Sequence, residues 1–258
     1  MRRALLLSAT LLAQPALAGD WPVEPQPQLG ADWSGGYAGI FGGAGISTGR
    51  AALADFYGAL IPADVAYGLF PGEIKHAKAG GLVGAAAGVN FQSGAFVGGV
   101  EADIGYAFTD VHNSYSRIDN VPGSPFPGVS TNTGYETDFG LLGTLRARGG
   151  YAFGDTLLFA TAGLAAGDVR NRLSLGLPEI GYASPDWSGS GMRFGYALGI
   201  GVEHRLTGNV NLKFETIYVN LADRTVLGTD ASAFPGEAIG YRFSNDIVLP
   251  RLGVSMKF

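Results

Sequence analysis

Several segments of this chain alternate strictly between large apolar side chains and small or charged ones. In Arg193–Leu206 the even positions carry Phe, Tyr, Leu, Ile, Val, His and Leu, and the odd positions carry Gly, Ala or charged residues. Successive side chains of a strand point to opposite faces, so a period of two predicts β-strands with one apolar face. The chain is therefore expected to be all-β.

Eight segments show this pattern or a weaker form of it, and bacterial outer-membrane barrels require an even number of strands. In the first segment the sequence does not show whether the odd or the even positions face lipid. Pro250 in the last segment predicts a bulge, because proline cannot donate a ladder hydrogen bond. The expected strands are Trp33–Ile46, Ala79–Gln92, Ala95–Phe108, Asp138–Phe153, Thr156–Asp168, Arg193–Leu206, Asn209–Ala222 and Ser244–Phe258.

The connections between these segments distinguish a membrane barrel from a soluble sandwich. Three are short, at Gln92–Gly94, Phe153–Asp155 and Thr207–Asn209. The others are expected to be long loops, at Ser47–Lys78, Thr109–Thr137, Val169–Met192 and Asp223–Phe243. Short turns at one end and long loops at the other are typical of an eight-stranded antiparallel up-and-down transmembrane β-barrel, with both termini on the periplasmic side.

Aromatic residues mark the two ends of the apolar face. Such girdles are typical of the two membrane interfaces. Those near the short turns are Phe91, Phe96, Tyr151 and Phe258, and those toward the long loops are Tyr106, Phe108, Phe194, Tyr196 and Tyr218. The chain ends on Phe258 after an alternating segment, which resembles the signal that the outer-membrane assembly machinery recognises.

The N-terminus predicts export. Residues 1–18 combine two arginines, an apolar stretch and a small-x-small site at Ala16–Ala18, the pattern of a cleaved signal peptide. Residues 19–32 contain three prolines and predict a periplasmic linker, which leaves 33–258 for the barrel. The absence of cysteine excludes disulfides and thiol chemistry. A net charge of -5 without basic runs argues against a nucleic-acid partner.

Charged residues on the inner face predict a plugged lumen. An eight-stranded barrel is only wide enough for its own side chains, and unpaired charges there would cost several kcal/mol each. We expect a salt-bridged network, with an ion-selective constriction as the alternative. The inward set is Glu101, Asp103, Glu203 and Glu215 against Arg146, Arg148, Arg205, Lys213, Arg251 and Lys257.

Three stretches carry a family resemblance: Trp33–Gly39, Leu142–Phe153, and Gly201–Glu203 followed by Val210–Leu221. Taken in order, they resemble the small outer-membrane β-barrel proteins of the opacity and RopB-like porin family, whose fold is related to the OmpA transmembrane domain. The resemblance implies an outer-membrane location and a structural, antigenic, adhesive or weakly pore-forming role. It implies no catalytic site.

Other functions have weaker support in the sequence. His112-Asn113-Ser114 resembles the His-x-Ser arrangement of lipid A deacylases, but its surroundings are ordinary loop chemistry. The three histidines show no metal-binding spacing, so no metal, cofactor or enzymatic activity is expected. We expect a structural barrel with a closed or very narrow lumen in contact with outer-membrane lipid and lipopolysaccharide. A small ion or solute porin, or an adhesin that binds a surface ligand through its long loops, is the alternative.

Overall fold

The computed structural model describes residues 31–75, 77–120 and 127–258. The predicted signal peptide, and the linker apart from residues 31 and 32, lie outside this part of the chain. These residues include two short helices, α1 (Ile61–Ala66) and the 3₁₀ helix η1 (Pro178–Ile180). The strands are β1 (Gly35–Ser47), β2 (Arg50–Tyr57), β3 (Glu73–Lys75), β4 (Lys78–Ser93), β5 (Phe96–Ile118), β6 (Ser130–Phe153), β7 (Thr156–Leu177), β8 (Tyr182–Ala183), β9 (Trp187–Arg205), β10 (Val210–Thr229) and β11 (Ala238–Lys257).

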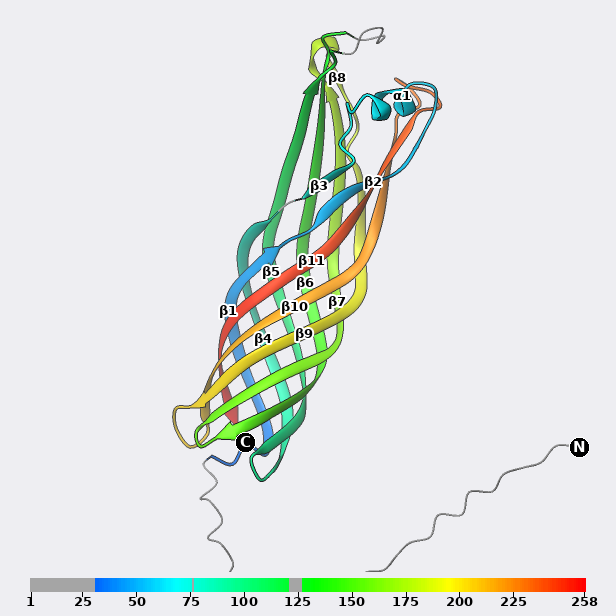
Figure 1. The fold of residues 1–258 in the computed structure, drawn as a ribbon. Helices are drawn as coiled ribbons and strands as arrows, with labels where there is room; N and C mark the ends of the chain where they lie inside the picture. Colours follow the sequence, from blue (N-terminus) through cyan, green and yellow to red (C-terminus); the bar gives the residue numbers. More distant parts are fainter. Residues whose placement is uncertain (1–30, 76, 121–126) are drawn as a thin grey trace, which may run out of the picture.

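Eight of these strands form a closed antiparallel ring. They follow one another in the order β1, β4, β5, β6, β7, β9, β10 and β11, and β11 pairs with β1 to close the ring. Figure 1 shows the result as a tilted cylinder, with the C-terminus at the end that carries the short turns. The predicted eight-stranded up-and-down barrel is thereby confirmed, because each ring strand pairs antiparallel with its neighbours in the chain.

The strands β2 and β3 continue two strands of the ring. Ser47 of β1 pairs with Ile247, and Ala51 of β2 pairs with Phe243. An advance of four residues from β1 into β2 therefore matches four residues back along β11, and the register is kept. The register is also kept from β4 to β3, because Ser47 pairs with Lys78 and Arg50 pairs with Lys75. The barrel wall therefore extends past the ends of β1 and β4, and β8 adds only a short pairing to β7.

The structure settles the parity of the first strand. Tyr37 and Phe41 are buried in the lumen, whereas Ile40 is 71% exposed on the outer face. Glycines on β4 make room for the two inward rings. A Cβ at Gly84 would lie 2.3 Å from Phe41, and one at Gly88 would lie 2.5 Å from the Tyr37 hydroxyl.

Pro250 does not produce the predicted bulge. Pro250 stays in register opposite Thr216 of β10, between Leu249 and Arg251. Toward β1 the ladder skips two positions, Ala44 and Gly45, between the pairs Gly43–Arg251 and Ile46–Val248, without a shift in register. A proline without an N–H can interrupt the ladder on one side only, because the hydrogen bonds of successive residues point to opposite neighbours.

Most of the segments predicted as long loops are strands. Thr109–Ile118 and Ser130–Thr137 extend β5 and β6, and the neighbouring strands lengthen in the same way. In these extensions the inward side chains become apolar, as at Tyr135 and Leu173, and the outward ones polar, as at Glu136. Water replaces lipid around this part of the barrel, so the apolar side of the alternation changes from outside to inside.

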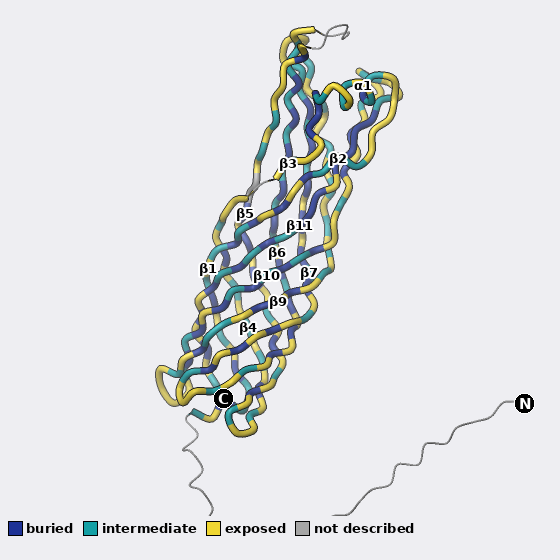
Figure 2. The backbone as a smooth tube through the Cα atoms, viewed as in Figure 1, coloured by how far each residue is buried: buried dark blue, intermediate teal, exposed yellow. Residues whose placement is uncertain are grey.

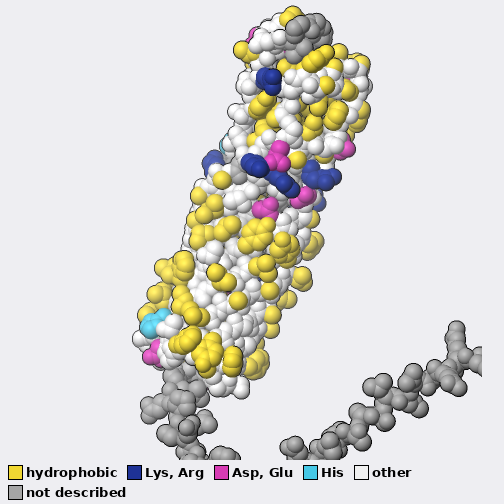
Figure 3. All heavy atoms as spheres, in the orientation of Figure 1, with side chains coloured by type: hydrophobic (Ala, Val, Ile, Leu, Met, Phe, Trp, Pro, Cys, Tyr) yellow, Lys and Arg dark blue, Asp and Glu magenta, His cyan; other side chains and the backbone are white. Residues whose placement is uncertain are grey.

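The outer face of the barrel carries the predicted apolar band. Figure 3 shows hydrophobic side chains over the half nearer the short turns and a group of charged side chains beyond it. Phe96 and Tyr151 touch edge to face near the turns, and Tyr106 packs on Phe108 at the far side of the band. All four rings are exposed, as expected for interfacial girdles. No helix in the described residues is long and apolar enough to cross a membrane.

Buried and exposed residues alternate along the strands, as Figure 2 shows. The buried side chains form layers from the turn end of the barrel to the loop end. Leu157 and Phe159 pack in an apolar cluster with Trp33 and Val97 at the turn end. Charged residues follow, then an apolar cluster that includes Phe139, Leu142 and Leu221. A polar layer is formed by Asn171, Thr137 and Asn245. A last apolar cluster, around Tyr135, Tyr241 and Phe243, fills the extension beyond the membrane band.

Candidate functional site

The charged layer gathers most of the inward residues predicted from the sequence. We define the luminal network as the side chains that meet there through ion pairs. Its four carboxylates and four cations are Glu101, Asp103, Glu203, Glu215, Arg146, Arg148, Lys213 and Arg251. The formal charges of this network cancel, which favours mutual pairing among buried groups.

Arg146 of β6 lies at the centre of the network, with a side chain that is 0% exposed. Its guanidinium donates from Nη2 to Glu101 at 2.6 Å and Asp103 at 2.9 Å. From Nη1 it donates to Glu215 at 2.5 Å. Two threonine hydroxyls, Thr144 and Thr161, accept the remaining contacts from Nε and Nη1. The planar guanidinium thus satisfies its donors in three directions at once, which a lysine ammonium does not match.

The other cations pair around this centre. Arg251 donates to Glu215 at 2.8 Å and to Asp103 at 3.1 Å, and its guanidinium lies 4.2 Å from the centroid of the Phe41 ring. Lys213 Nζ lies 2.5 Å from Glu101. Together with the contacts of Arg146, these contacts join β5, β6, β10 and β11, so the network crosses the lumen and connects strands that are not neighbours in the ring.

Arg148 forms a second centre closer to the turn end. It donates to the Glu203 carboxylate, and its guanidinium stacks 3.9 Å from the centroid of the Phe159 ring. The Tyr37 hydroxyl lies 3.1 Å from Arg148 and donates to Glu101 at 2.7 Å, which links the two centres. Tyr37 was missed by the sequence reasoning because the parity of its strand was undecided. Assignment of the odd positions of this strand to the inner face would have placed Tyr37 in the lumen.

Removal of the Tyr37 hydroxyl tests this link. Tyr37→Phe leaves one hydrogen bond of Glu101 unmade in the buried network, so we expect the barrel to lose about 1–3 kcal/mol of stability. Urea unfolding of the protein in lipid vesicles, followed by tryptophan fluorescence, measures the change. Tyr151→Phe on the outer face is the matched control, and an equal effect in both variants would contradict the assigned role of Tyr37.

Two predicted inward cations lie outside the network, at the turn end. Arg205 donates to the Asp32 carbonyl oxygen at 2.6 Å and lies over the Trp33 ring at 4.9 Å from its centroid. Lys257 pairs with the Asp32 carboxylate at 2.9 Å, which lowers the pKa of Asp32. Arg205 lies one inward position beyond Glu203, and Lys257 lies three inward positions beyond Arg251, so both contact the incoming chain instead of the network. Phe258 is 80% exposed at the same end, and its role as an assembly signal stays a prediction.

The His112 motif occupies a strand and not the expected loop. His112 Nδ1 lies 3.4 Å from a Glu136 carboxylate oxygen on the exposed face of the barrel extension, and Arg172 donates to the same carboxylate. The backbone amide of Ser114 donates a hydrogen bond to the Asn113 side chain. His112 is thus a surface histidine paired with a carboxylate.

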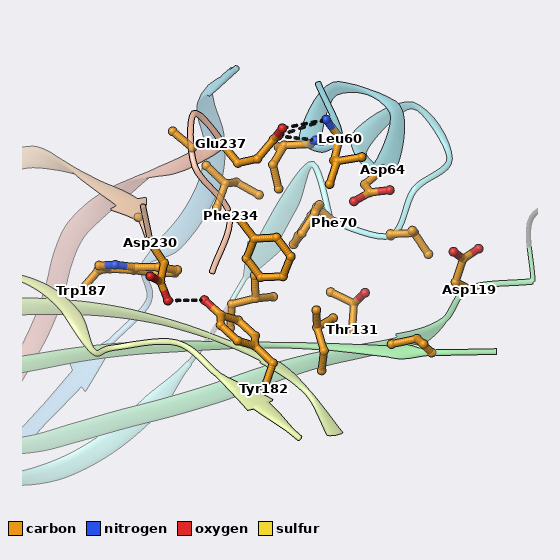
Figure 4. Close-up of a pocket in the computed structure, with 18 residues that line it drawn as sticks. Leu60, Asp64, Phe70, Asp119, Thr131, Tyr182, Trp187, Asp230, Phe234 and Glu237 are labelled. Atoms are coloured by element: carbon orange, nitrogen blue, oxygen red, sulfur yellow. Dashed lines mark hydrogen bonds between the residues drawn. The ribbon is translucent and has the colours of Figure 1, made fainter. Parts of the chain in front are cut away.

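The loop end of the barrel contains a pocket that the sequence did not predict. Its volume is about 70 Å³. Figure 4 shows it between α1 and the ends of β6 to β11, with Phe70, Tyr182, Trp187 and Phe234 around it. Tyr182 and Phe234 meet edge to face at 4.9 Å between ring centroids. We call this cavity the outer pocket.

Four carboxylates also line the outer pocket: Asp64, Asp119, Asp230 and Glu237. Glu237 accepts hydrogen bonds from the backbone amides of Ala59, Leu60 and Ile61 and so holds the start of α1. These bonds keep the pKa of Glu237 below its usual range despite partial burial. Asp230 accepts from the Tyr182 hydroxyl at 3.0 Å and from Ser232. Asp64 and Asp119 lie together on the opposite side of the pocket from Trp187.

Burial, with the negative charges of Asp119 and Glu237, raises the pKa of Asp64 to about 6. A raised carboxyl pKa means that the folded state binds the proton more tightly, so stability rises as pH falls from above 6 toward 4. We expect Asp64→Asn to protect the amides of α1 from hydrogen exchange at pH 7.5 relative to wild type. The difference should vanish near pH 4. A difference that is the same at both pH values would contradict this.

The fold and the buried network together define an outer-membrane β-barrel. The family model described as "Outer membrane protein beta-barrel domain" matches residues 4–243, and the chain belongs to this family. A 22 kDa outer membrane protein of Rhizobium leguminosarum bv. viciae is 32% identical over 66% of this chain and 63% of its own length. The chain thus aligns with less than two thirds of that relative. The protein is located in the outer membrane, as are the relatives by name.

A second relative covers more of the chain. The 25 kDa outer-membrane immunogenic protein of Brucella abortus is 28% identical over 86% of this chain and 84% of its own length. Among solved structures, the outer membrane protein OprG of Pseudomonas aeruginosa has a TM-score of 0.48 at 14% identity and covers 90% of this chain and 99% of its own. The outer membrane protease OmpT of Escherichia coli has a TM-score of 0.44 at 10% identity, over 90% of this chain and 100% of its own.

Proposed function

We propose that this protein is a structural barrel with a closed lumen that contributes to the integrity and surface properties of the outer membrane. The observation that carries the proposal is the luminal network, in which Arg146, Glu101 and Glu215 are fully buried and held by one another. Charges that line a water-filled channel remain hydrated, whereas these have exchanged water for direct partners.

The layers around the network add support. A path for ions would have to cross the apolar cluster at the turn end and the cluster around Phe139, Leu142 and Leu221. Inward residues of β7 follow this order within one strand: Leu157, Phe159, Thr161, Ala165, Val169, Asn171, Leu173 and Leu175. Apolar layers on both sides of a neutral charged layer oppose the passage of hydrated ions. We therefore favour the structural role over the porin alternative.

The partners in this proposal follow from the outer face. Its apolar band would contact outer-membrane lipid and lipopolysaccharide, and Phe258 would be recognised by the assembly machinery. Short turns of such barrels face the periplasm, so the loop end would project from the cell. The name of the Brucella relatives, an outer-membrane immunogenic protein, is consistent with such an exposed end. A surface ligand would bind there.

A deletion strain separates the structural role from the porin role. We expect loss of the protein to raise sensitivity to detergents and bulky apolar antibiotics, while the uptake rate of a small hydrophilic solute stays unchanged. Plasmid-borne wild-type protein should restore resistance. Slower solute uptake with unchanged detergent sensitivity would contradict the structural role and support a porin.

A further inference from the structure

We propose that the outer pocket binds a small organic cation, an ammonium group attached to a short apolar chain. The site is independent of the luminal network, because it lies in the barrel extension beyond the membrane band. Neither the family nor the structural role proposed above requires it.

The shape and lining of the outer pocket determine the apolar part of the ligand. Ile61, Phe70, Leu175 and Ile239 form its floor and belong to the apolar cluster of the extension. The cavity of about 70 Å³ holds roughly five groups of the size of a water molecule, which suits a short alkyl chain. Four aromatic rings around it favour a cation, because the face of an aromatic ring is electron-rich.

The charges around the outer pocket determine the sign of the ligand. Asp64, Asp119, Asp230 and Glu237 line it, and no lysine or arginine is among its lining residues in the described chain. Glu237 and Asp230 are engaged by the start of α1 and by Tyr182. Asp64 has neither a hydrogen bond nor an ion pair to its carboxylate within the described residues, although it is partly buried.

The surroundings of Asp64 leave its charge uncompensated. Asp119 is buried beside it, and Glu237 lies directly before β11. The Arg117 guanidinium lies near Gly68, just past the end of α1, and forms no ion pair with Asp64 within the described residues. A partly buried carboxylate that is flanked by two other carboxylates gains from a bound cation.

The aromatic wall is built to stay in place. Trp187 packs on Gly228, where a Cβ would lie 2.4 Å from the indole ring, and its Nε1 donates to the Thr229 carbonyl oxygen at 2.9 Å. The Tyr182 hydroxyl is fixed by Asp230. A rigid wall loses little conformational entropy when a ligand binds, so a small ligand can be held. Trp187 also reports on the pocket by its fluorescence.

The test is a titration of the folded full chain in detergent with n-pentylammonium, followed by tryptophan fluorescence. We expect a saturable change that is absent in Trp187→Phe. Pentanoate and pentanol, which share the chain but lack the positive charge, should bind at least tenfold more weakly. Equal binding of pentanol, or no saturable change with pentylammonium, would overturn the proposal.

Variants and pH test the role of the carboxylate. Asp64→Asn should weaken pentylammonium binding at least tenfold at pH 7.5, whereas Asp155→Asn in a turn at the opposite end should have no effect. Asp119→Asn tests the same side of the pocket if Asp64→Asn fails to fold. Wild-type affinity should fall about tenfold between pH 7.5 and pH 5, because protons compete for Asp64 while the amine stays charged. Unchanged affinity in both folded variants would overturn the assignment.

Discussion

Arg146→Ala is expected to destabilise the barrel more than any other single substitution in the lumen. The variant removes the cation that contacts Glu101, Asp103 and Glu215, and it leaves these carboxylates buried with fewer partners. Loss of one partner from a buried ion pair typically costs 3–5 kcal/mol, and we expect about that loss here. Urea unfolding in lipid vesicles measures it.

The control for this experiment is an arginine whose ion pair is exposed. Arg50 pairs with Glu73 at 3.9 Å, and its side chain is well exposed on β2. Such a pair contributes roughly 0–1 kcal/mol, so Arg50→Ala should unfold like wild type. Identical unfolding midpoints for Arg146→Ala and wild type would show that the luminal network does not hold the barrel together.

Gly163→Ala is expected to have the second-largest effect. Gly163 faces the lumen on β7, opposite Arg146, and a Cβ there would lie 2.0 Å from the Leu145 carbonyl oxygen and 2.6 Å from the Arg146 Cα. Backbone atoms cannot move aside as a flexible side chain can, so β6 and β7 must separate at the level of the network. The expected loss is about 1–3 kcal/mol, the usual cost of overpacking.

Gly149→Ala provides the matched substitution. Gly149 lies on β6 of the same strand pair but faces outward, and nothing lies within 4 Å of a Cβ built there. The added methyl group would only meet lipid, so stability should be unchanged or slightly higher. Equal losses in the two variants would indicate a general intolerance of alanine and not a close approach at Gly163. Heat-dependent gel mobility of the folded barrel gives a rapid first measurement.

The sequence predicted the membrane part of the barrel well, because the alternation has one clearly apolar side in every strand there except the first. Phe194, Leu198 and Ile200 face lipid in the structure as expected. The ends of the strands at the short turns agree to within a few residues. Beyond the membrane band the prediction failed, because the apolar side changes from outside to inside and a pattern of mixed polarity looks like a loop.

The luminal network shows a similar division. Residues such as Glu101 and Arg146 were assigned to the lumen because they alternate with the apolar residues that face lipid. Parity does not give depth along the barrel, so Arg205 was grouped with the network although it lies at the turn end. The outer pocket was not predictable, because it joins residues far apart in the sequence, such as Asp64 and Trp187, through strand extensions that the pattern did not reveal.

Single-channel conductance of the folded, unboiled protein in a planar lipid bilayer tests the closed lumen most directly. A neutral buried network between apolar layers predicts no unitary current steps above those of the boiled control, with folding verified by gel mobility. Reproducible steps from folded wild-type protein, with an ion selectivity that changes in Glu203→Gln, would contradict the account and identify a small porin.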